Sequence, residues 1–133
     1  MGSGAEGDLR RLLEIDPDNA DALNALGYTL ADNTRRYDEA LVLIERAMRL
    51  KPDDAAILDS MGWVKFRLGE LDEAVTLLRA AYAKQAEAEI AAHLGEALWR
   101  KGEREEATLI WREALNRQPD DAALRDTLRR HGL

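Results

Sequence analysis

The chain has 133 residues, of which 46% are hydrophobic and 34% charged, with a net charge of −7 and no cysteine. The lack of cysteine excludes disulfides, thiolate metal sites and a cysteine nucleophile. The negative charge argues against binding to nucleic acid or anionic membrane surfaces. No apolar stretch is long enough to cross a membrane, so we expect no membrane insertion by this segment. The hydrophobic content argues against disorder, and the scarcity of β-branched runs favours an all-α protein.

The N-terminal region contains one helical pattern before the first proline. Residues 1–5 are short and polar, and we expect a disordered expression tag there. Apolar side chains three and four residues apart then predict a helix, and they are Leu9, Leu12 and Leu13. Pro17 ends this helix, because proline removes a backbone donor and disfavours helix at the residue before it. We interpret residues 6–18 as the orphan second helix of a truncated repeat.

Three copies of a helix–turn–helix pattern follow, at residues 19–54, 55–87 and 88–121. Small residues and closing prolines recur in them at equivalent positions, with a period of about 34 residues that is typical of stacked helical repeats. These structural positions are Gly27, Gly62 and Gly95 in the first helices, Ala40, Ala74, Ala107, Ala47, Ala81 and Ala114 in the second, and Pro52 and Pro119 at the ends. We therefore expect helical hairpins that pack against their neighbours.

The repeated glycines have a packing reason. Helix axes approach to about 8–10 Å where the contact residues are small, whereas a glycine inside a helix costs roughly 1 kcal/mol relative to alanine. We therefore expect Gly62→Leu to unfold the array. In the first copy, the turn at residues 32–36 lacks the glycine of its counterparts, and we expect Asn33 to adopt a left-handed conformation there.

Residues 122–133 are predicted to be a capping helix. Its arginines give it the wet outer face that a terminal helix of an array needs, and they are Arg125, Arg129 and Arg130. His131 lies in the tail, where we expect it to have no particular role.

The repeated residues resemble the consensus of the tetratricopeptide repeat (TPR) family over about residues 8–133. This resemblance implies an all-α, right-handed superhelical solenoid of about eight helices. It also implies a non-enzymatic scaffold or adaptor that binds a protein partner and needs no cofactor. An alternative is a purely structural, stabilising end of a longer array, with recognition by repeats that are missing.

Two short runs carry a finer resemblance. Residues 59–63 (Asp-Ser-Met-Gly-Trp) and 91–96 (Ala-Ala-His-Leu-Gly-Glu) resemble the last repeats of large proteobacterial repeat lipoproteins. Some of those proteins are adaptors for periplasmic proteases of the carboxy-terminal processing type. The resemblance implies a periplasmic or outer-membrane-associated parent, with this fragment soluble, and a periplasmic protease or its substrate as the partner.

The first helices of such arrays line the concave surface. Residues four and seven apart share a helical face, which places an aromatic stripe edged by mixed charge on that surface. The residues expected to be exposed there and to bind a peptide or partner helix are Asn24, Tyr28, Asp59, Trp63, Phe66, Arg67, His93, Glu96 and Trp99. For Phe66 and Trp99, packing between neighbouring first helices is the alternative. The lysines that clamp a terminal carboxylate in some TPR domains are absent.

Three further possibilities concern chemistry and assembly. Ser60 and His93 occupy equivalent positions, but nothing in the sequence suggests a strained nucleophile turn or converging amides, so we expect no enzyme. Glu89, His93 and Glu96 share a helical face that could hold a metal weakly, yet a solvated face is the simpler interpretation, and we expect no metal site. The leucine face of residues 6–15 lacks a partner helix, so a homodimer through that end and a monomer are both open.

Overall fold

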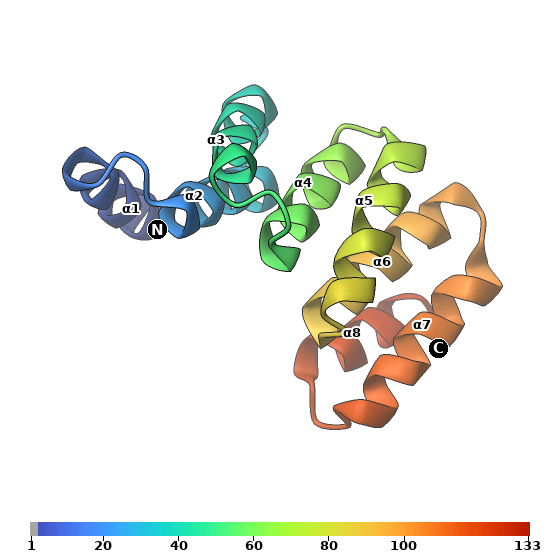
Figure 1. The fold of residues 1–133 in the computed structure, drawn as a ribbon. Coiled ribbons are helices and arrows are strands. Elements are labelled where there is room, and N and C mark those ends of the chain that lie inside the picture. The colour runs from blue at the N-terminus through green and yellow to red at the C-terminus, as the bar shows by residue number, and fades with distance from the viewer. Residues whose placement is uncertain (1–2) are drawn as a thin grey trace.

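The computed structural model describes residues 3–133, and these form eight α-helices without a strand. The helices stack in chain order into a curved array, with α1 and α8 at its two ends (Figure 1). Their bounds are α1 Ser3–Ile15, α2 Ala20–Asn33, α3 Tyr37–Leu50, α4 Ala55–Arg67, α5 Leu71–Lys84, α6 Ala88–Lys101, α7 Arg104–Arg117 and α8 Ala122–Arg130. This confirms the predicted all-α solenoid. Within the described residues, no helix combines the length and apolar character that crossing a membrane requires.

Proline followed by an acidic or amide side chain sets the start of three helices. Two residues after a proline, the side chain of Asn19, Asp54 or Asp121 accepts a hydrogen bond from the backbone amide three residues later, at 2.9, 3.1 and 2.9 Å. These caps satisfy amides that have no partner within the helix. At the start of α6, where the proline is missing, Glu87 makes no such side-chain bond.

Two expectations about local structure were wrong. Residues 3–5 are helical, as part of α1, where disorder had been expected, while Met1 and Gly2 lie outside the described residues. Asn33 is the last residue of α2, and no non-glycine residue of the described chain has a positive φ. The hydroxyl of Thr34 instead donates to the carbonyl of Leu30 at 2.5 Å. That bond closes the helix end, so no left-handed residue is required there.

The repeated small residues bring the two helices of each hairpin together. A Cβ added to Gly27, Gly62 or Gly95 would lie 2.5, 2.6 or 1.9 Å from a side-chain atom of the second helix, which belongs to Ile44, Leu78 and Trp111 respectively. Because real Cβ contacts are longer, only glycine fits without a shift of its neighbour. These contacts join one core cluster that extends from Ala20 in α2 to Leu128 in α8.

The α1 helix buries less of its equivalent face. Leu12 lies five residues before Pro17, as Ala47 and Ala114 lie five residues before their own prolines. Leu12 is 41% exposed, whereas Ala47 and Ala114 are at most 1% exposed. Ile15 is 83% exposed. The second helix of a complete hairpin buries this position against its first helix, and α1 has no such helix among residues 3–133.

Candidate functional site

A groove of about 630 Å³ lies between the first helices α2, α4 and α6 and the terminal helix α8. Six of the residues predicted for the concave surface line it, namely Tyr28, Trp63, Phe66, Arg67, His93 and Glu96. Three others do not line it. Asp59 is buried behind His93, and Trp99 lines a separate hollow with Arg104 and Leu109. Asn24 is half-buried, and its Oδ1 accepts no hydrogen bond from the described residues.

The expectation that these residues are exposed was wrong for Asp59, Trp63 and His93, and Phe66 adopts its packed alternative. All four are 5–8% exposed. Trp63 stacks on Phe66 and on His93, with ring centroids 4.6 and 4.2 Å apart, and its indole donates to Asp32 at 3.1 Å. Large side chains on this face fill the space between adjacent first helices. The aromatic side chains therefore form the packed wall of the groove, and little of their surface is exposed.

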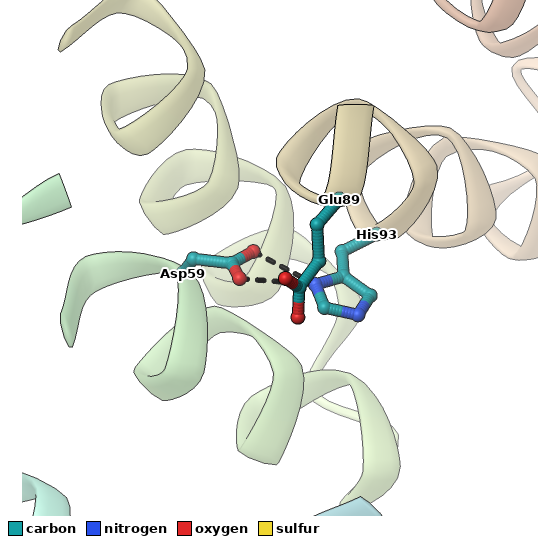
Figure 2. A group of neighbouring side chains, drawn as sticks. All are labelled: Asp59, Glu89 and His93. Carbon is teal, nitrogen blue, oxygen red and sulfur yellow. Dashed lines mark hydrogen bonds and ion pairs between the residues drawn. The ribbon is translucent and has the colours of Figure 1, made fainter. Parts of the chain in front are cut away.

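The wall contains a hydrogen-bonded chain across three repeats. His93 Nδ1 of α6 lies 2.9 and 3.1 Å from the two carboxylate oxygens of Asp59 in α4. His93 Nε2 lies 3.2 Å from the hydroxyl of Tyr28 in α2. Glu89, one helical turn before His93, brings a third polar group to the same place, and donor atoms of Asp59, Glu89 and His93 all lie within 4.8 Å of one another (Figure 2).

Tyr28 lies in negatively charged surroundings in the wall of the groove. Burial raises the pKa of its hydroxyl, and the nearby carboxylates of Asp32, Glu89 and Asp59 raise it further. Tyr28 therefore stays protonated near neutral pH and serves as a hydrogen-bonding group. A phenol held neutral in this way is a poor nucleophile. Ser60 is buried at 3% exposure, and the hydrogen bonds of His93 go to Asp59 and Tyr28 instead.

A second cluster, at the C-terminal end, was not predicted. His131 hydrogen-bonds to Glu96 and packs on Trp99 and Trp111, with ring centroids 4.6 and 4.9 Å away. Arg130 lies 3.5 Å from the same carboxylate. Glu96 is thus held by Arg130 of α8 and by His131, and not by His93, with which helical spacing had grouped it. Sequence reasoning missed His131 because the tail lies beyond the last copy, although His131 and Glu96 are about one repeat period apart.

The rim of the groove is acidic, where mixed charge had been expected. The carboxylates that line it outnumber the two arginines, Arg67 and Arg130, and they are Asp32, Glu89, Glu96, Asp121 and Asp126. The net charge of −7 is consistent with this excess. Such a rim raises the local concentration of cations and of basic segments.

Comparison with known proteins agrees with the repeat pattern. Family models described as Tetratricopeptide repeat match residues 9–42 and 60–123. The chain is 60% identical over 76 residues to "TPR repeat-containing protein PA4667" of Pseudomonas aeruginosa, and this segment is 57% of the chain but only 13% of that relative. The chain therefore spans a small part of the relative's length.

Solved structures share the fold. The structure of TTC0263, a thermophilic TPR protein of Thermus thermophilus, matches with a TM-score of 0.77 and 27% identity, covering 90% of this chain and 67% of that one. The structure of Pseudomonas aeruginosa pilF matches with a TM-score of 0.75 and 21% identity, covering 98% of this chain and 61% of the other. The second likeness concerns the fold alone.

Proposed function

Because the chain belongs to the tetratricopeptide repeat family, whose fold is generally that of a non-enzymatic protein-interaction scaffold, we propose that it binds a partner segment in the groove between α2, α4, α6 and α8. The observation that carries the proposal is the groove itself, which combines aromatic walls with an acidic rim. Aromatic side chains and arginine are frequent binding hot spots. A helix or an extended peptide can use such a groove.

The acidic rim defines the chemistry of the partner. Five carboxylates and two arginines line the groove, so an acidic segment would be repelled along most of its length. A segment that alternates apolar side chains with lysine or arginine complements both the Trp63 and Phe66 wall and the rim. Its charges would act mainly on the association rate and on partner selection.

The identity of the partner rests on resemblance. The two runs at residues 59–63 and 91–96 support an adaptor in the bacterial envelope, which would recruit a periplasmic protease or its substrate. The 60% identical relative from Pseudomonas aeruginosa supports a bacterial parent of greater length. In this proposal the segment contributes recognition and not catalysis.

A peptide selection tests the groove. The chain is immobilised and challenged with a displayed library of random peptides, and the enriched sequences are then measured by fluorescence anisotropy. Enrichment of basic, apolar peptides is expected. Asp126→Lys on the rim should weaken them about tenfold or more, because it replaces an attraction by a repulsion.

Glu45→Lys is the matched control, since Glu45 is an exposed acid on α3 and does not line the groove. It should leave the affinity unchanged. Equal effects of the two variants, or enrichment of acidic peptides, would reject the groove as the binding site.

The exposed face of α1 favours a second function, as one end of a longer helical array. Leu12 and Ile15 are 41% and 83% exposed, and a preceding helix would cover them as the first helices cover Ala47 and Ala114. In isolation the same face is the expected site of a homodimer. Light scattering over a wide concentration range tests this, and the double substitution Leu12→Lys and Ile15→Lys should restore the mass of one chain. A wild-type mass that stays at one chain throughout would reject the dimer.

A further inference from the structure

We propose that Asp59, Glu89 and His93 form a zinc-binding site in the wall of the groove. Helical spacing had associated His93 with Glu89 and Glu96, and on that basis no metal site was expected. In the structure the third donor beside His93 and Glu89 is Asp59 of the neighbouring repeat, and not Glu96. The proposal does not depend on partner binding, because all three donors belong to this chain.

The donor atoms are already close to coordination distance. The Nδ1 atom of His93 and the carboxylate of Asp59 are 2.9 Å apart, and the carboxylate of Glu89 brings all three donors within 4.8 Å of one another. Ligands at about 2.0–2.2 Å from a tetrahedral zinc ion lie roughly 3.3–3.6 Å from each other. Glu89 is exposed and free to turn toward the pair, so binding needs side-chain adjustment alone.

Charge balance favours a divalent ion. The side chains of Asp59 and His93 are 7% and 9% exposed, and an ionised carboxylate in such surroundings needs a compensating charge. Protonated His93 neutralises one carboxylate only, and the described residues provide no ion pair for Glu89. A zinc ion with neutral imidazole neutralises both carboxylates. The ion binds Nδ1 of an imidazole that carries its single proton on Nε2, so a second proton on Nδ1, where present, is released to solvent.

The imidazole is also oriented as a metal ligand requires. Ligating histidines are usually fixed by a hydrogen bond at the other ring nitrogen. Here Nε2 lies 3.2 Å from the hydroxyl of Tyr28, and Trp63 stacks on the ring at 4.2 Å. Both contacts leave Nδ1 directed at Asp59, as Figure 2 shows.

The donor set selects the class of ion. One imidazole nitrogen and two carboxylates suit zinc, whereas magnesium and calcium take shells made of oxygen ligands. Three protein ligands leave one position of a tetrahedral shell open. Glu89 and His93 both line the groove, so water or a group of a bound partner can reach the ion and complete the shell.

Calorimetric titration of the chelator-treated chain with zinc chloride tests the site. One ion per chain is expected, with no comparable binding of magnesium. Glu89→Gln should weaken zinc at least about tenfold, the lower range for disturbing a metal site. It should do so without a change in melting temperature, because Glu89 is exposed. Asp59→Asn should weaken zinc as well, and its melting temperature is measured alongside.

Two controls separate this site from others. His131→Gln removes the other histidine of the chain, which pairs with Glu96, and should leave zinc affinity unchanged. Glu105→Gln removes an exposed carboxylate of α7 and should also leave the zinc affinity unchanged. In nuclear magnetic resonance spectra, zinc should shift the ring signals of His93 and not those of His131. Absence of zinc binding, full affinity in Glu89→Gln, or a shift confined to His131 would each overturn the proposal.

Discussion

Gly95 of α6 packs directly against Trp111 of α7, and a Cβ on Gly95 would lie 1.9 Å from Nε1 of Trp111. Trp111 is fully buried and its indole donates to the carbonyl of Ala92 at 3.3 Å, so the ring has little room to move. Gly95→Ala should therefore destabilise the chain by about 1–3 kcal/mol through overpacking, although alanine is the better helix former. Urea unfolding measures the change.

Gly7→Ala in α1 is the matched control. A Cβ there would meet only the end of the Arg11 side chain, at 3.7 Å. The substitution should raise stability by up to about 1 kcal/mol, the difference in helix propensity. If Gly95→Ala were equally stabilising, the close approach of α6 and α7 would be wrong.

Trp63 is expected to be essential for stability. It is 8% exposed, stacks on Phe66 and His93, and bonds to Asp32. Trp63→Ala should cost about 3–5 kcal/mol, measured by chemical unfolding. Trp63→Phe keeps most of the ring contact and should cost clearly less. Equal losses would mean that the hydrogen bond to Asp32, and not ring packing, dominates. A loss of about 3–5 kcal/mol would also make Trp63→Ala unsuitable for testing partner binding, because the substitution would unfold the groove itself.

Glu6 should make the anchoring of α1 sensitive to acid. Hydrogen bonds from Arg36 and Arg10 lower the pKa of Glu6 from 4.5 to about 2. A carboxyl group with a lowered pKa stabilises the folded state fully above about pH 4.5, and the contribution is lost as the pH falls toward 2. Thermal melts across this range should show a smaller decline for Glu6→Gln than for the wild type.

Glu14→Gln is the control for that titration, because Glu14 is an exposed acid on the same helix. It should retain the wild-type decline. A Glu6→Gln chain that loses stability as steeply as the wild type would assign the acid sensitivity to other carboxylates.

His131 should hold the C-terminal helix in place. Its imidazole bonds to Glu96 and packs on Trp99 and Trp111. His131→Ala should weaken the attachment of α8 by about 1.5–3 kcal/mol, the range for a hydrogen bond to a charged group. Hydrogen exchange of residues 122–133 should become faster while α4 stays protected. Arg129→Ala serves as the control, since Arg129 is largely exposed and, among residues 3–133, forms an ion pair only with Asp126 of the same helix. Unchanged exchange in His131→Ala would contradict the role.

The sequence predicted the hairpins because each depends on contacts that recur. Ala40, Ala74 and Ala107 are all fully buried, as a period of about 34 residues requires. The proline and aspartate signals likewise predicted the helix boundaries, through local hydrogen bonds. Asn33 shows the limit of such reasoning, because Thr34 offered a different side-chain bond that closes the same turn.

The groove was predicted less completely. Helical spacing assigns side chains to faces of one helix, but it does not give the depth to which the next helix covers them. Trp63 was therefore correctly predicted to face the groove, but it was expected to be exposed and is buried. The pairing of Asp59 with His93 joins residues 34 apart, and that of His131 with Glu96 joins residues 35 apart. Both pairs match the repeat period, so residues one period apart are the place to search for inter-repeat polar contacts.

The bond between Tyr28 and His93 also bears on cooperativity. The two residues are 65 positions apart and belong to the first and third hairpins, so their contact at 3.2 Å spans the whole middle hairpin. In a linear array each unit normally senses only its immediate neighbours, and such chains can unravel from an end. A hydrogen bond between the first and third hairpins opposes such unravelling from an end. It also favours the curved form of the array, because straightening would separate the two side chains and break this bond.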